Sequence, residues 1–335
     1  MDASDLALFA EVAHTGCISK AAINLNTVQS NVTQRVQLLE DELGVPLFYR
    51  HSRGVTLTTA GGQLLPYAER IARLVGEAKQ AAMDGPVPHG QISIGAMETA
   101  TALRLPPLLS AYASRYPDVD IEINTGPTAG LIEQVLERHI EAGFVAGPLE
   151  HPELLAIPVI QEELVVVTAP WIRSLPALAG NPQGGVKIIV FRSGCSYRVR
   201  LENLLAARGI VALRRLELGS LDGIVGCVAA GIGLTLLPRI VVEQSERDGR
   251  VAIHRLPAHE AQVQTVLVRR RDAFVSTALG SFIEMAADYF HQAHGEHALP
   301  REIALKKSSG RERPAAHTSH SRASASGAER LRTSL

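Results

Sequence analysis

The sequence predicts an α/β protein with a small, mainly α-helical first domain, a long connecting helix and a larger domain of alternating strands and helices. Three patterns support this division. Apolar residues follow helical spacing in the first 61 residues and heptad spacing from Gly61 to Met83, and strand-like and helical runs alternate beyond Gln91. With 335 residues, 46% of them hydrophobic, the chain can bury more than one core.

Three helices are expected at the start of the chain. Glycines at positions 16 and 44 interrupt the helical spacing, and Asn26 and Thr27 supply turn and N-cap chemistry before the third helix. The expected helices run from Leu6 up to Gly16, from Ile18 to Leu25 and from Val28 to Leu43. Two helices joined by a tight turn, the second one longer and polar on its outer side, form a helix-turn-helix.

Two short strands around a turn follow the third helix. The runs Leu47 to Arg50 and Val55 to Thr58 have strand character, and residues 51–54 between them contain turn-forming types. Together with the preceding helices they predict a winged helix-turn-helix.

The outer face of the third helix carries the candidate DNA contacts. At 100° per residue, Val32 and Val36 point to one side, and short polar side chains point to the other. Such side chains hydrogen-bond to base edges, whereas arginines at the flank and in the wing suit phosphates. The predicted DNA-binding residues are Thr27, Gln29, Ser30, Asn31, Thr33, Gln34, Arg35, Arg50 and Arg53, of which the arginines are assigned to the DNA backbone.

The helix expected from Gly61 to Met83 has apolar residues in alternating steps of four and three. These residues are Leu64, Ala68, Ile71, Val75, Ala78 and Ala82. Heptad spacing favours a helix that packs against a partner helix, although an amphipathic helix packed on its own domain shows the same spacing. The glycine and prolines of residues 84–90 predict a hinge after this helix.

The first domain resembles the DNA-binding domain of LysR-type transcription regulators. The resemblance covers the first 61 residues and depends on the order of Ala21-Ala22, Gln29, Leu39-Glu40, Leu43-Gly44, Leu47-Phe48, Arg50, Leu57-Thr58 and Ala60-Gly61. It implies a ligand-responsive, sequence-specific DNA-binding regulator, an activator or a repressor. It also implies that residues 62–84 dimerise, that a homodimer or homotetramer binds an interrupted palindrome in double-stranded DNA, and that RNA polymerase is a partner.

The second domain alternates short strands with helices. The expected strands are Ile92 to Gly95, Val119 to Asn124, Gly143 to Ala146, Leu164 to Thr168, Lys187 to Phe191, Leu216 to Gly219, Leu234 to Leu236 and Val263 to Arg269. The expected helices are Leu103 to Tyr116, Ala129 to His139, Arg198 to Arg208, Leu221 to Ala230 and Phe274 to Phe290. The resemblance implies that residues 91–295 form a two-lobed effector domain similar to periplasmic binding proteins, with lobe I at about 91–161 and 267–295 and lobe II at about 162–266.

Polar residues directly after the expected strands are candidates for effector binding. Ligands of α/β proteins bind at the carboxyl ends of strands, and free N–H groups at helix N-termini suit anions. A serine or threonine in such a position is also an ordinary N-cap. The predicted effector residues are Thr99, Thr101, Thr125, Gly126, Thr128, Ser193, Cys195, Ser196, Tyr197 and Ser220, and the expected ligand is a small organic molecule, with an anion favoured. Arg198 either pairs with a ligand carboxylate or is a solvated charge.

A thiol-based redox-sensing regulator is an alternative within the same family. Cys195 lies in a polar turn before a helix, where thiolate formation is favoured, whereas Cys227 lies in an apolar helix and is expected in the core. With Cys17 they make three widely spaced cysteines, which match neither a disulfide framework nor a zinc site.

Other classes of protein have less support. The sequence has no nucleophile-elbow, P-loop or zinc-protease motif, so we expect neither catalysis nor a cofactor. His291, His294 and His297 lack a further residue at ligand spacing, and no metal is expected. A solute-binding protein would carry an export signal, whereas the acidic opening of this chain and its lack of long apolar runs predict a cytoplasmic protein without a membrane span.

The charge of the chain is nearly balanced. A net charge of -1 provides no global attraction to nucleic acid, so any DNA affinity must come from a local surface. Residues 296–335 are rich in Ser, Arg, Ala and His and are expected to form a disordered, slightly basic tail.

Overall fold

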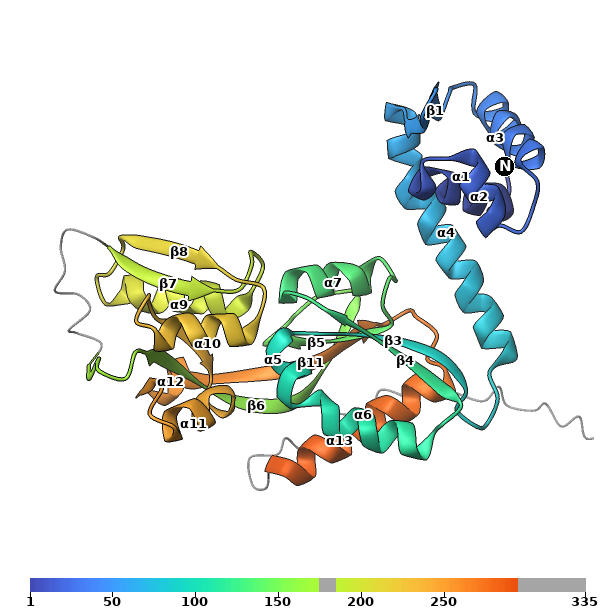
Figure 1. Cartoon of the computed structure of the whole chain (residues 1–335). Coiled ribbons are helices and arrows are strands. Elements are labelled where there is room, and N and C mark those ends of the chain that lie inside the picture. Colours follow the sequence, from blue (N-terminus) through green and yellow to red (C-terminus); the bar gives the residue numbers. More distant parts are fainter. Residues whose placement is uncertain (175–184, 295–335) are drawn as a thin grey trace, which may run out of the picture. The chain divides into compact units, whose positions relative to one another are not determined.

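The computed structural model describes residues 1–174 and 185–294 of the chain (Figure 1). The expected tail at 296–335 and His297 lie outside the described residues. The first elements are α1 (Ala3–Thr15), α2 (Ile18–Asn24), α3 (Gln29–Leu43), β1 (Phe48–His51), β2 (Gly54–Leu57) and α4 (Thr59–Met83). The three expected helices, the two-stranded wing and the long helix are therefore confirmed, with ends that differ by up to three residues.

Local chemistry sets the helix ends in this first part. The Asp2 carboxylate accepts hydrogen bonds from the N–H groups of Ser4 and Asp5, so that α1 begins with a capping box. Gly16 ends α1 and Gly44 ends α3, each with a positive φ that suits glycine.

The expected N-cap of α3 is wrong. Val28 is the N-cap residue, and its side chain cannot accept a hydrogen bond from the helix. The Thr27 hydroxyl instead accepts a hydrogen bond of 2.9 Å from the Asn31 side-chain amide, while Asn26 takes up a left-handed turn at φ 53°. The turn between the two helices therefore depends on backbone geometry at Asn26 more than on a capping hydroxyl.

A single small core holds these elements together. Val32, Val36 and Leu39 of α3 are buried in it, which confirms the predicted inner face of the helix. The rings of Phe9 in α1 and Phe48 in β1 lie 5.2 Å apart in the same core. The outer side of α3 remains exposed because the core covers only its apolar stripe.

Helix α4 divides into two parts with different packing. Ala68 is buried, and Leu64 and Ile71 pack against the core of the first part of the chain. Farther along, Leu74 and Val75 are 41% and 37% exposed. The first half of α4 thus packs on its own domain, whereas the second half presents apolar side chains that the described residues leave partly uncovered.

Strands and helices alternate through the rest of the described chain. These elements are β3 (Gly90–Ala96), α5 (Glu98–Leu103), α6 (Leu105–Arg115), β4 (Val119–Thr125), α7 (Thr128–Leu136), β5 (Ala142–Ala146), β6 (Leu154–Thr168), β7 (Val186–Val190), α9 (Ser196–Ala207), β8 (Leu213–Glu217), α10 (Leu221–Ala229), β9 (Thr235–Pro238), α11 (Arg239–Arg247), β10 (Ala252–Arg255), α12 (Ala258–Ala261), β11 (Gln262–Arg270) and α13 (Thr277–His294).

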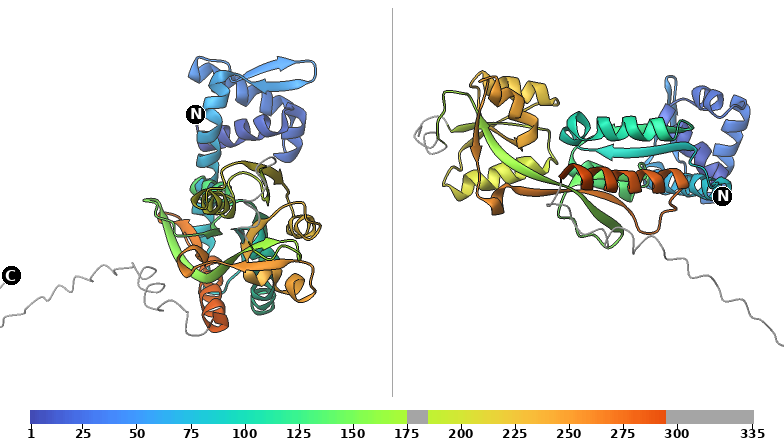
Figure 2. Two further views of the ribbon diagram at one scale, coloured as in Figure 1. Left: turned by 90° about the vertical axis from the view of Figure 1, so that its left-hand side faces the viewer. Right: turned by 90° about the horizontal axis from the view of Figure 1, so that it is seen from below.

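The sheet path β10-β6-β11-β5-β3-β4 joins two lobes through the long strand β6. Its first part, Leu154 to Glu163, pairs with β11, and its last residues pair with β9 and β10. We call β3 to β5 with α5 to α7 and α13 lobe I, and β7 to β10 with α9 to α12 lobe II. Figure 2 (right) shows β6 and β11 passing between the two lobes.

Each lobe has its own core, and a third cluster connects them. In lobe I, Phe144 of β5 and Phe282 of α13 are fully buried, and the Tyr112 hydroxyl donates to the Ala278 carbonyl at 2.8 Å. In the connecting cluster, Met97 and Leu131 of lobe I pack with residues of lobe II that include Tyr197. The two-lobed α/β architecture predicted from the sequence is confirmed.

Several predicted elements in this part need correction. The expected helix Leu103 to Tyr116 is two helices, because the chain breaks at Arg104 before two prolines start α6. The expected strand Leu216 to Gly219 is β8, which begins three residues earlier and ends at Glu217. The first half of β6, β10, α11 and α12 were not predicted.

We predict opposite effects for two neighbouring glycines of α4. A Cβ at Gly61 would lie 2.2 Å from the Leu47 carbonyl oxygen, so Gly61→Ala should lower the free energy of unfolding by about 1–3 kcal/mol. A Cβ at Gly62 meets nothing within 4 Å, so Gly62→Ala should raise it by about 0.5 kcal/mol through helix propensity. Urea unfolding followed by circular dichroism tests both, and equal effects would contradict the close approach at Gly61.

Candidate DNA-binding surface and effector cleft

From Gln29 to Gln34 the outer face of α3 is polar, uncharged and largely exposed. Gln29, Ser30, Asn31 and Gln34 are exposed, and Thr33 is half-buried. The side-chain carbonyl oxygen of Gln29 accepts a hydrogen bond of 2.9 Å from the Ser19 hydroxyl of α2. The Thr33 hydroxyl donates to the Gln29 backbone carbonyl at 3.0 Å, within its own helix. Ser30 and Gln34 therefore present the most accessible hydrogen-bonding groups of the predicted set.

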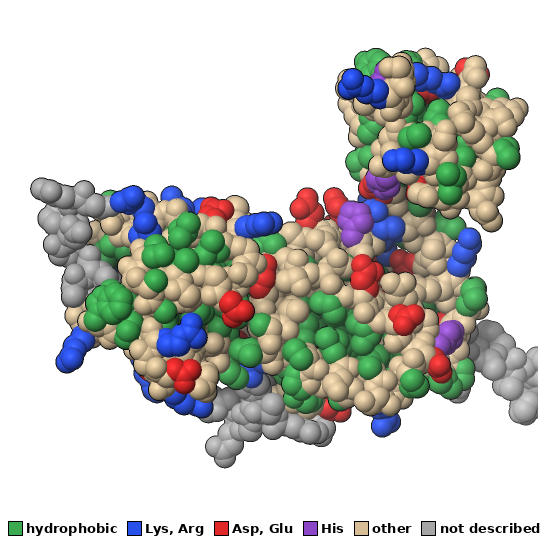
Figure 3. All heavy atoms as spheres, in the orientation of Figure 1, with side chains coloured by type: hydrophobic (Ala, Val, Ile, Leu, Met, Phe, Trp, Pro, Cys, Tyr) green, Lys and Arg blue, Asp and Glu red, His purple; other side chains and the backbone are tan. Residues whose placement is uncertain are grey.

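Glu40 of α3 binds residues at the start of the wing. Its Oε1 accepts hydrogen bonds from the N–H groups of Leu47 and Phe48 at 2.7 and 3.1 Å, and its Oε2 lies 3.5 Å from the Arg50 guanidinium. Arg50 and Arg53 of the wing are exposed. Figure 3 shows Lys and Arg side chains over the end of this domain where Figure 1 labels β1. The wing therefore carries positive charge at a fixed place beside α3.

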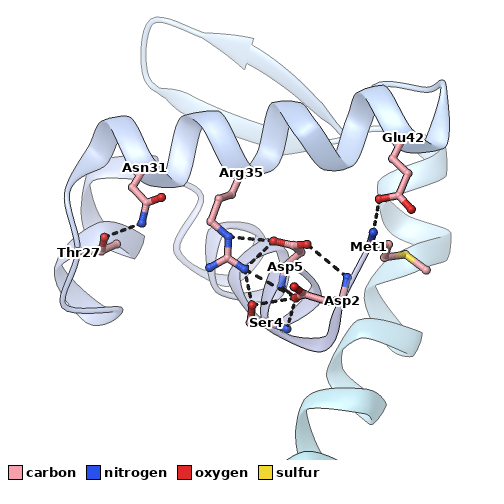
Figure 4. Close-up of polar contacts among 8 residues, drawn as sticks. All are labelled: Met1, Asp2, Ser4, Asp5, Thr27, Asn31, Arg35 and Glu42. Atoms are coloured by element: carbon pink, nitrogen blue, oxygen red, sulfur yellow. Dashed lines mark hydrogen bonds and ion pairs between the residues drawn. The ribbon is translucent and has the colours of Figure 1, made fainter.

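Arg35 is engaged inside the domain (Figure 4). Its Nε donates to the Asp5 carboxylate at 2.9 Å, and its Nη2 donates to the Ser4 hydroxyl and to Asp5. The side chains of Arg35 and Asp5 are 29% and 24% exposed. The guanidinium thus holds α3 against the start of α1, a role that sequence analysis missed because Asp5 lies 30 residues away. Contact with phosphate stays a prediction.

Three helix N-termini meet at the interface between the lobes. Thr99 of α5, Thr128 of α7 and Tyr197 of α9 are each less than 9% exposed. Thr99 lies close enough to Tyr197 to lower the pKa of its hydroxyl, and the Ala129 N–H donates to the Gly194 carbonyl at 3.4 Å. The structure therefore brings together residues that the sequence places about 100 positions apart.

The same interface includes residues that the sequence analysis did not select. Arg200 of α9 donates to the Gly147 carbonyl of lobe I at 3.0 Å. Met97 receives a hydrogen bond on its sulfur from Thr128, and its backbone carbonyl accepts one from Thr101. Gly194, with φ 92°, packs its Cα side against Pro127. Of these residues, only Gly194 could have been noticed in the sequence, because a glycine between Ser193 and Cys195 is typical of a turn.

The remaining predicted effector residues differ in their surroundings. Ser220 is exposed and caps α10 by accepting a hydrogen bond from the Gly223 N–H at 3.2 Å, as the N-cap alternative predicted. Thr125 and Ser193 are exposed as well, while Gly126 is buried. Cys195 is the N-cap residue of α9 and Ser196 its first residue, both half-buried. Thr99, Thr128, Cys195, Ser196 and Tyr197 thus form the compact part of the predicted set.

Burial controls protonation at this interface. It raises the pKa of the Tyr197 hydroxyl, with a smaller contribution from Glu162, so that Tyr197 stays neutral and can donate a hydrogen bond. Burial also raises the pKa of the Cys195 thiol. The expectation that its position before a helix favours the thiolate is therefore wrong, because desolvation outweighs the helix N–H groups.

Arg198 is paired within lobe II. Its guanidinium contacts Glu202 at 3.2 Å and Glu217 at 2.6 Å. These two carboxylates occupy the side chain that could otherwise pair with an anionic ligand.

The described residues contain neither a metal-ligand cluster nor a helix that could span a membrane. Within residues 1–174 and 185–294, no group of three His, Cys, Asp or Glu side chains is arranged to hold a metal ion. No helix in these ranges has the length and apolar character needed to cross a bilayer.

A winged helix-turn-helix followed by a two-lobed α/β domain defines a DNA-binding regulator with a ligand-binding domain. Residues 3–62 match the family model of bacterial regulatory helix-turn-helix proteins of the lysR family, and residues 86–291 match the LysR substrate binding domain. The chain belongs to the LysR family of transcription regulators, as the sequence resemblance implied.

Relatives of known name are transcription regulators. The chain is 41% identical over 288 residues to the HTH-type transcriptional regulator GltR of Bacillus subtilis. This match covers 85% of this chain and 96% of the relative. It is 38% identical over 291 residues to CzcR of Bacillus cereus, covering 87% of this chain and 99% of the relative.

Solved structures show the same fold. Full-length CbnR complexed with its target DNA is 24% identical with a TM-score of 0.61, and the match covers 87% of this chain and all of that one. Full-length OxyR of Pseudomonas aeruginosa is 19% identical with a TM-score of 0.61, covering 87% of this chain and 95% of that one.

We predict that Arg35 and Asp5 are energetically coupled. In a double-mutant cycle with Arg35→Gln and Asp5→Asn, the coupling in the free energy of unfolding should be about 1 kcal/mol, because each change leaves the partner without its ion pair. Asp41→Asn, an equal charge change at an exposed position of α3, is the control and should change stability by less than about 0.5 kcal/mol. Additive effects at positions 5 and 35 would disprove the coupling.

Proposed function

We propose that this LysR-type regulator reads its operator with the outer face of α3 and responds to a small ligand bound between lobes I and II. In this proposal residues 1–61 bind DNA, 62–84 dimerise, 85–90 act as a hinge, and 91–295 bind the effector. The observation that carries it is the exposed, uncharged, hydrogen-bonding face of α3, set between a tight turn and a basic wing.

The DNA contacts fall into two groups. Ser30 and Gln34, with Gln29, Asn31 and Thr33 beside them, would hydrogen-bond to base edges in the major groove. Arg50 and Arg53 would contact phosphates, which adds affinity without sequence preference. Since Arg35 already pairs with Asp5, we assign it to holding α3 in place and treat a phosphate contact as secondary.

The second half of α4 supports assembly into a homo-oligomer. Its exposed Val75 follows the heptad spacing, and Leu74 and Met83 add apolar surface, with Met83 75% exposed. Tyr67, in the first half of α4, is 67% exposed. A second copy of α4 would cover these side chains and place two DNA-binding domains on the halves of a palindrome. A homodimer formed in this way can pair again into a homotetramer.

The effector cleft suits a small organic molecule, and we favour an anion. The N-termini of α7 and α9 approach each other there, where the Ala129 N–H now donates to the Gly194 carbonyl, and N–H groups at helix N-termini can bind a carboxylate or phosphate. Thr99, Thr128, Ser196 and the neutral hydroxyl of Tyr197 add hydrogen-bond donors. A ligand bound between the lobes must separate or reorient Thr99 and Tyr197, which now lie near each other.

The position of Thr99 and Tyr197 between the lobes suggests how ligand binding could change transcription from the target promoter. A ligand that binds the two arrangements of the lobes with different affinity shifts the population between them. In an oligomer, that shift changes the spacing of the DNA-binding domains, the bend of the DNA and the contact with RNA polymerase. We place this function in the cytoplasm, where bacterial chromosomal DNA lies.

The redox-sensing alternative has less support than ligand sensing. A sensor cysteine reacts as the thiolate and is accessible, whereas burial raises the pKa of Cys195. Cys227 packs half-buried against the core of lobe II.

Replacement of the outer residues of α3 should separate specific from nonspecific binding. We predict that Ser30→Ala with Gln34→Ala weakens operator binding at least tenfold and leaves affinity for unrelated duplex unchanged, because only base contacts are lost. Arg53→Gln should weaken both and reduce the slope of log K against log salt by about one. Fluorescence anisotropy at several salt concentrations measures these values, and an unchanged operator affinity in the double variant would overturn the assignment of α3.

Replacement of cleft hydroxyls should uncouple the ligand response from DNA binding. We predict that Thr99→Val or Thr128→Val abolishes regulation of the target promoter in a reporter strain while operator affinity stays within about twofold. Ser114→Ala is the control, because the exposed Ser114 hydroxyl donates to the Ser110 carbonyl of its own helix α6 and is outside the predicted effector residues. Equal loss of regulation in the control and the two cleft variants would contradict the cleft as the effector site. The promoter for this assay comes from genomic footprinting of the tagged protein.

A further inference from the structure

We propose that a second site, at the junction of the second half of α4 with lobe I, binds a small organic anion. The site is a cavity of about 230 Å³. It is separate from the interlobe cleft, because residues of α4, the end of α7, β11 and the segment before α13 line it.

The cavity has a cationic wall and an apolar wall. Arginines at positions 73, 138, 269 and 270 supply the first, while Val135, Phe274 and Leu279 contribute to the second. Not all of this charge is available to a ligand, because some of these arginines already have carboxylate partners.

Arg270 is fully occupied. Its Nε donates to Asp272 at 2.7 Å, its Nη2 to Glu153 at 2.8 Å, and its Nη1 to the Leu136 carbonyl at 2.8 Å. It is 5% exposed. Arg270 therefore stabilises lobe I through all three of its guanidinium nitrogens, and we assign it no contact with the ligand.

Arg138 keeps one buried donor without an acceptor. Its terminal nitrogens pair with Glu77 of α4 and with Asp272, but its Nε has no hydrogen-bond partner among the described residues. The side chain is only 10% exposed. Its backbone is held at φ 62°, a conformation that costs a non-glycine residue energy, and the two ion pairs offset that cost.

Of the four arginines, Arg73 and Arg269 have the weakest contacts with carboxylates. The nearest carboxylate to Arg73 is that of Glu69 at 3.8 Å, and its buried Nε lacks an acceptor within the described part of the chain. Arg269 donates to the Arg270 carbonyl, and no ion pair to a described acid is formed. The Arg73 side chain is 23% exposed, and burial lowers the pKa of both guanidinium groups.

The acids at the cavity are committed to other groups. Glu77 accepts from Arg138 and from the Phe274 N–H. Glu141 accepts a hydrogen bond of 3.0 Å from the Ser93 N–H, and burial raises the pKa of its carboxyl. The cavity thus holds desolvated positive charge that an anion would neutralise, which relieves the cost of burying unpaired cations.

The size and the walls of the cavity indicate the class of ligand. A single water needs only about 10–15 Å³ of such space, so about 230 Å³ accommodates a molecule of several non-hydrogen atoms. Guanidinium groups bind carboxylate or phosphate through paired donors, and the apolar wall suits a short hydrocarbon segment. A small mono- or dicarboxylate fits both requirements.

A ligand in this position would contact the linker helix and lobe I together. Arg73 lies on α4, and Arg269 on β11 of lobe I. Two acids already join this helix to lobe I. Glu77 of α4 pairs with Arg138, and Asp84, the C-cap residue of α4, accepts a hydrogen bond of 2.8 Å from the Thr277 hydroxyl. Binding would therefore change the balance of contacts that fixes α4 to the effector domain, and so influence DNA binding independently of the cleft.

Isothermal titration calorimetry of the full chain with sodium succinate, at constant ionic strength, tests this inference. The unchanged protein should bind one succinate per chain with a saturable signal. Arg269→Gln should weaken binding about tenfold to a hundredfold, because a charged hydrogen-bond donor is lost without breaking an ion pair. Arg73→Gln should have a similar effect, and circular dichroism confirms that both variants fold.

Three control variants locate the bound anion. Arg247→Gln removes an arginine that is 68% exposed on α11, Arg53→Gln alters the wing, and Thr128→Val alters the cleft. All three should bind succinate as the unchanged protein does. The inference is overturned if the unchanged protein shows no saturable binding up to about 10 mM, if Arg269→Gln binds equally well, or if Thr128→Val alone abolishes binding. The last outcome would assign the anion to the interlobe cleft and leave the proposed function intact.

Discussion

Burial of the apolar stripe of α3 is the constraint on which the rest of the DNA-binding domain depends. Val32, Val36 and Leu39 pack into the small core with α1 and the wing, so the opposite side of the helix has to face outward. Two polar contacts fix the rotation and tilt of the helix. Arg35 binds Asp5 at one place, and Glu40 accepts the backbone N–H groups of Leu47 and Phe48 at another. The polar groups that can reach DNA are thus set by interactions that never touch it.

In the effector domain, the paired strands β6 and β11 connect two lobes. Each lobe buries apolar residues of its own, and a third apolar cluster that includes Met97, Leu131 and Tyr197 connects the lobes. At the same interface Thr99 lies near Tyr197, and Arg200 of lobe II donates to the Gly147 carbonyl of lobe I. The cavity beside α4 is lined by residues of the linker helix and of lobe I.

Structure could be predicted from the sequence where the signal was local. Spacing of apolar residues located α1 to α4 because helix burial repeats every 3.6 residues, and the glycines at 16 and 44 marked helix ends through their backbone freedom. Prediction failed where the deciding partner is distant or the local signal is weak. β10 and α11 are short and carry mixed polar and apolar residues, and the first half of β6 lacks the continuous valine run of its second half. The pairing of Arg198 with Glu217 could not be anticipated from position 198 alone.

By itself, the sequence determined the family, the order of the domains and the polar face of α3, since each follows from patterns within tens of residues. Only the tertiary structure decided which charges are available to ligands. Arg35, Arg198 and Arg270 are occupied by carboxylates, whereas Arg269 forms no ion pair with a described acid and Arg73 has only the Glu69 carboxylate at 3.8 Å. It likewise decided that Cys195 is held as a thiol, because burial is a property of the packed fold. Charge and reactivity depend on neighbours in space, and the linear order of residues does not specify those neighbours.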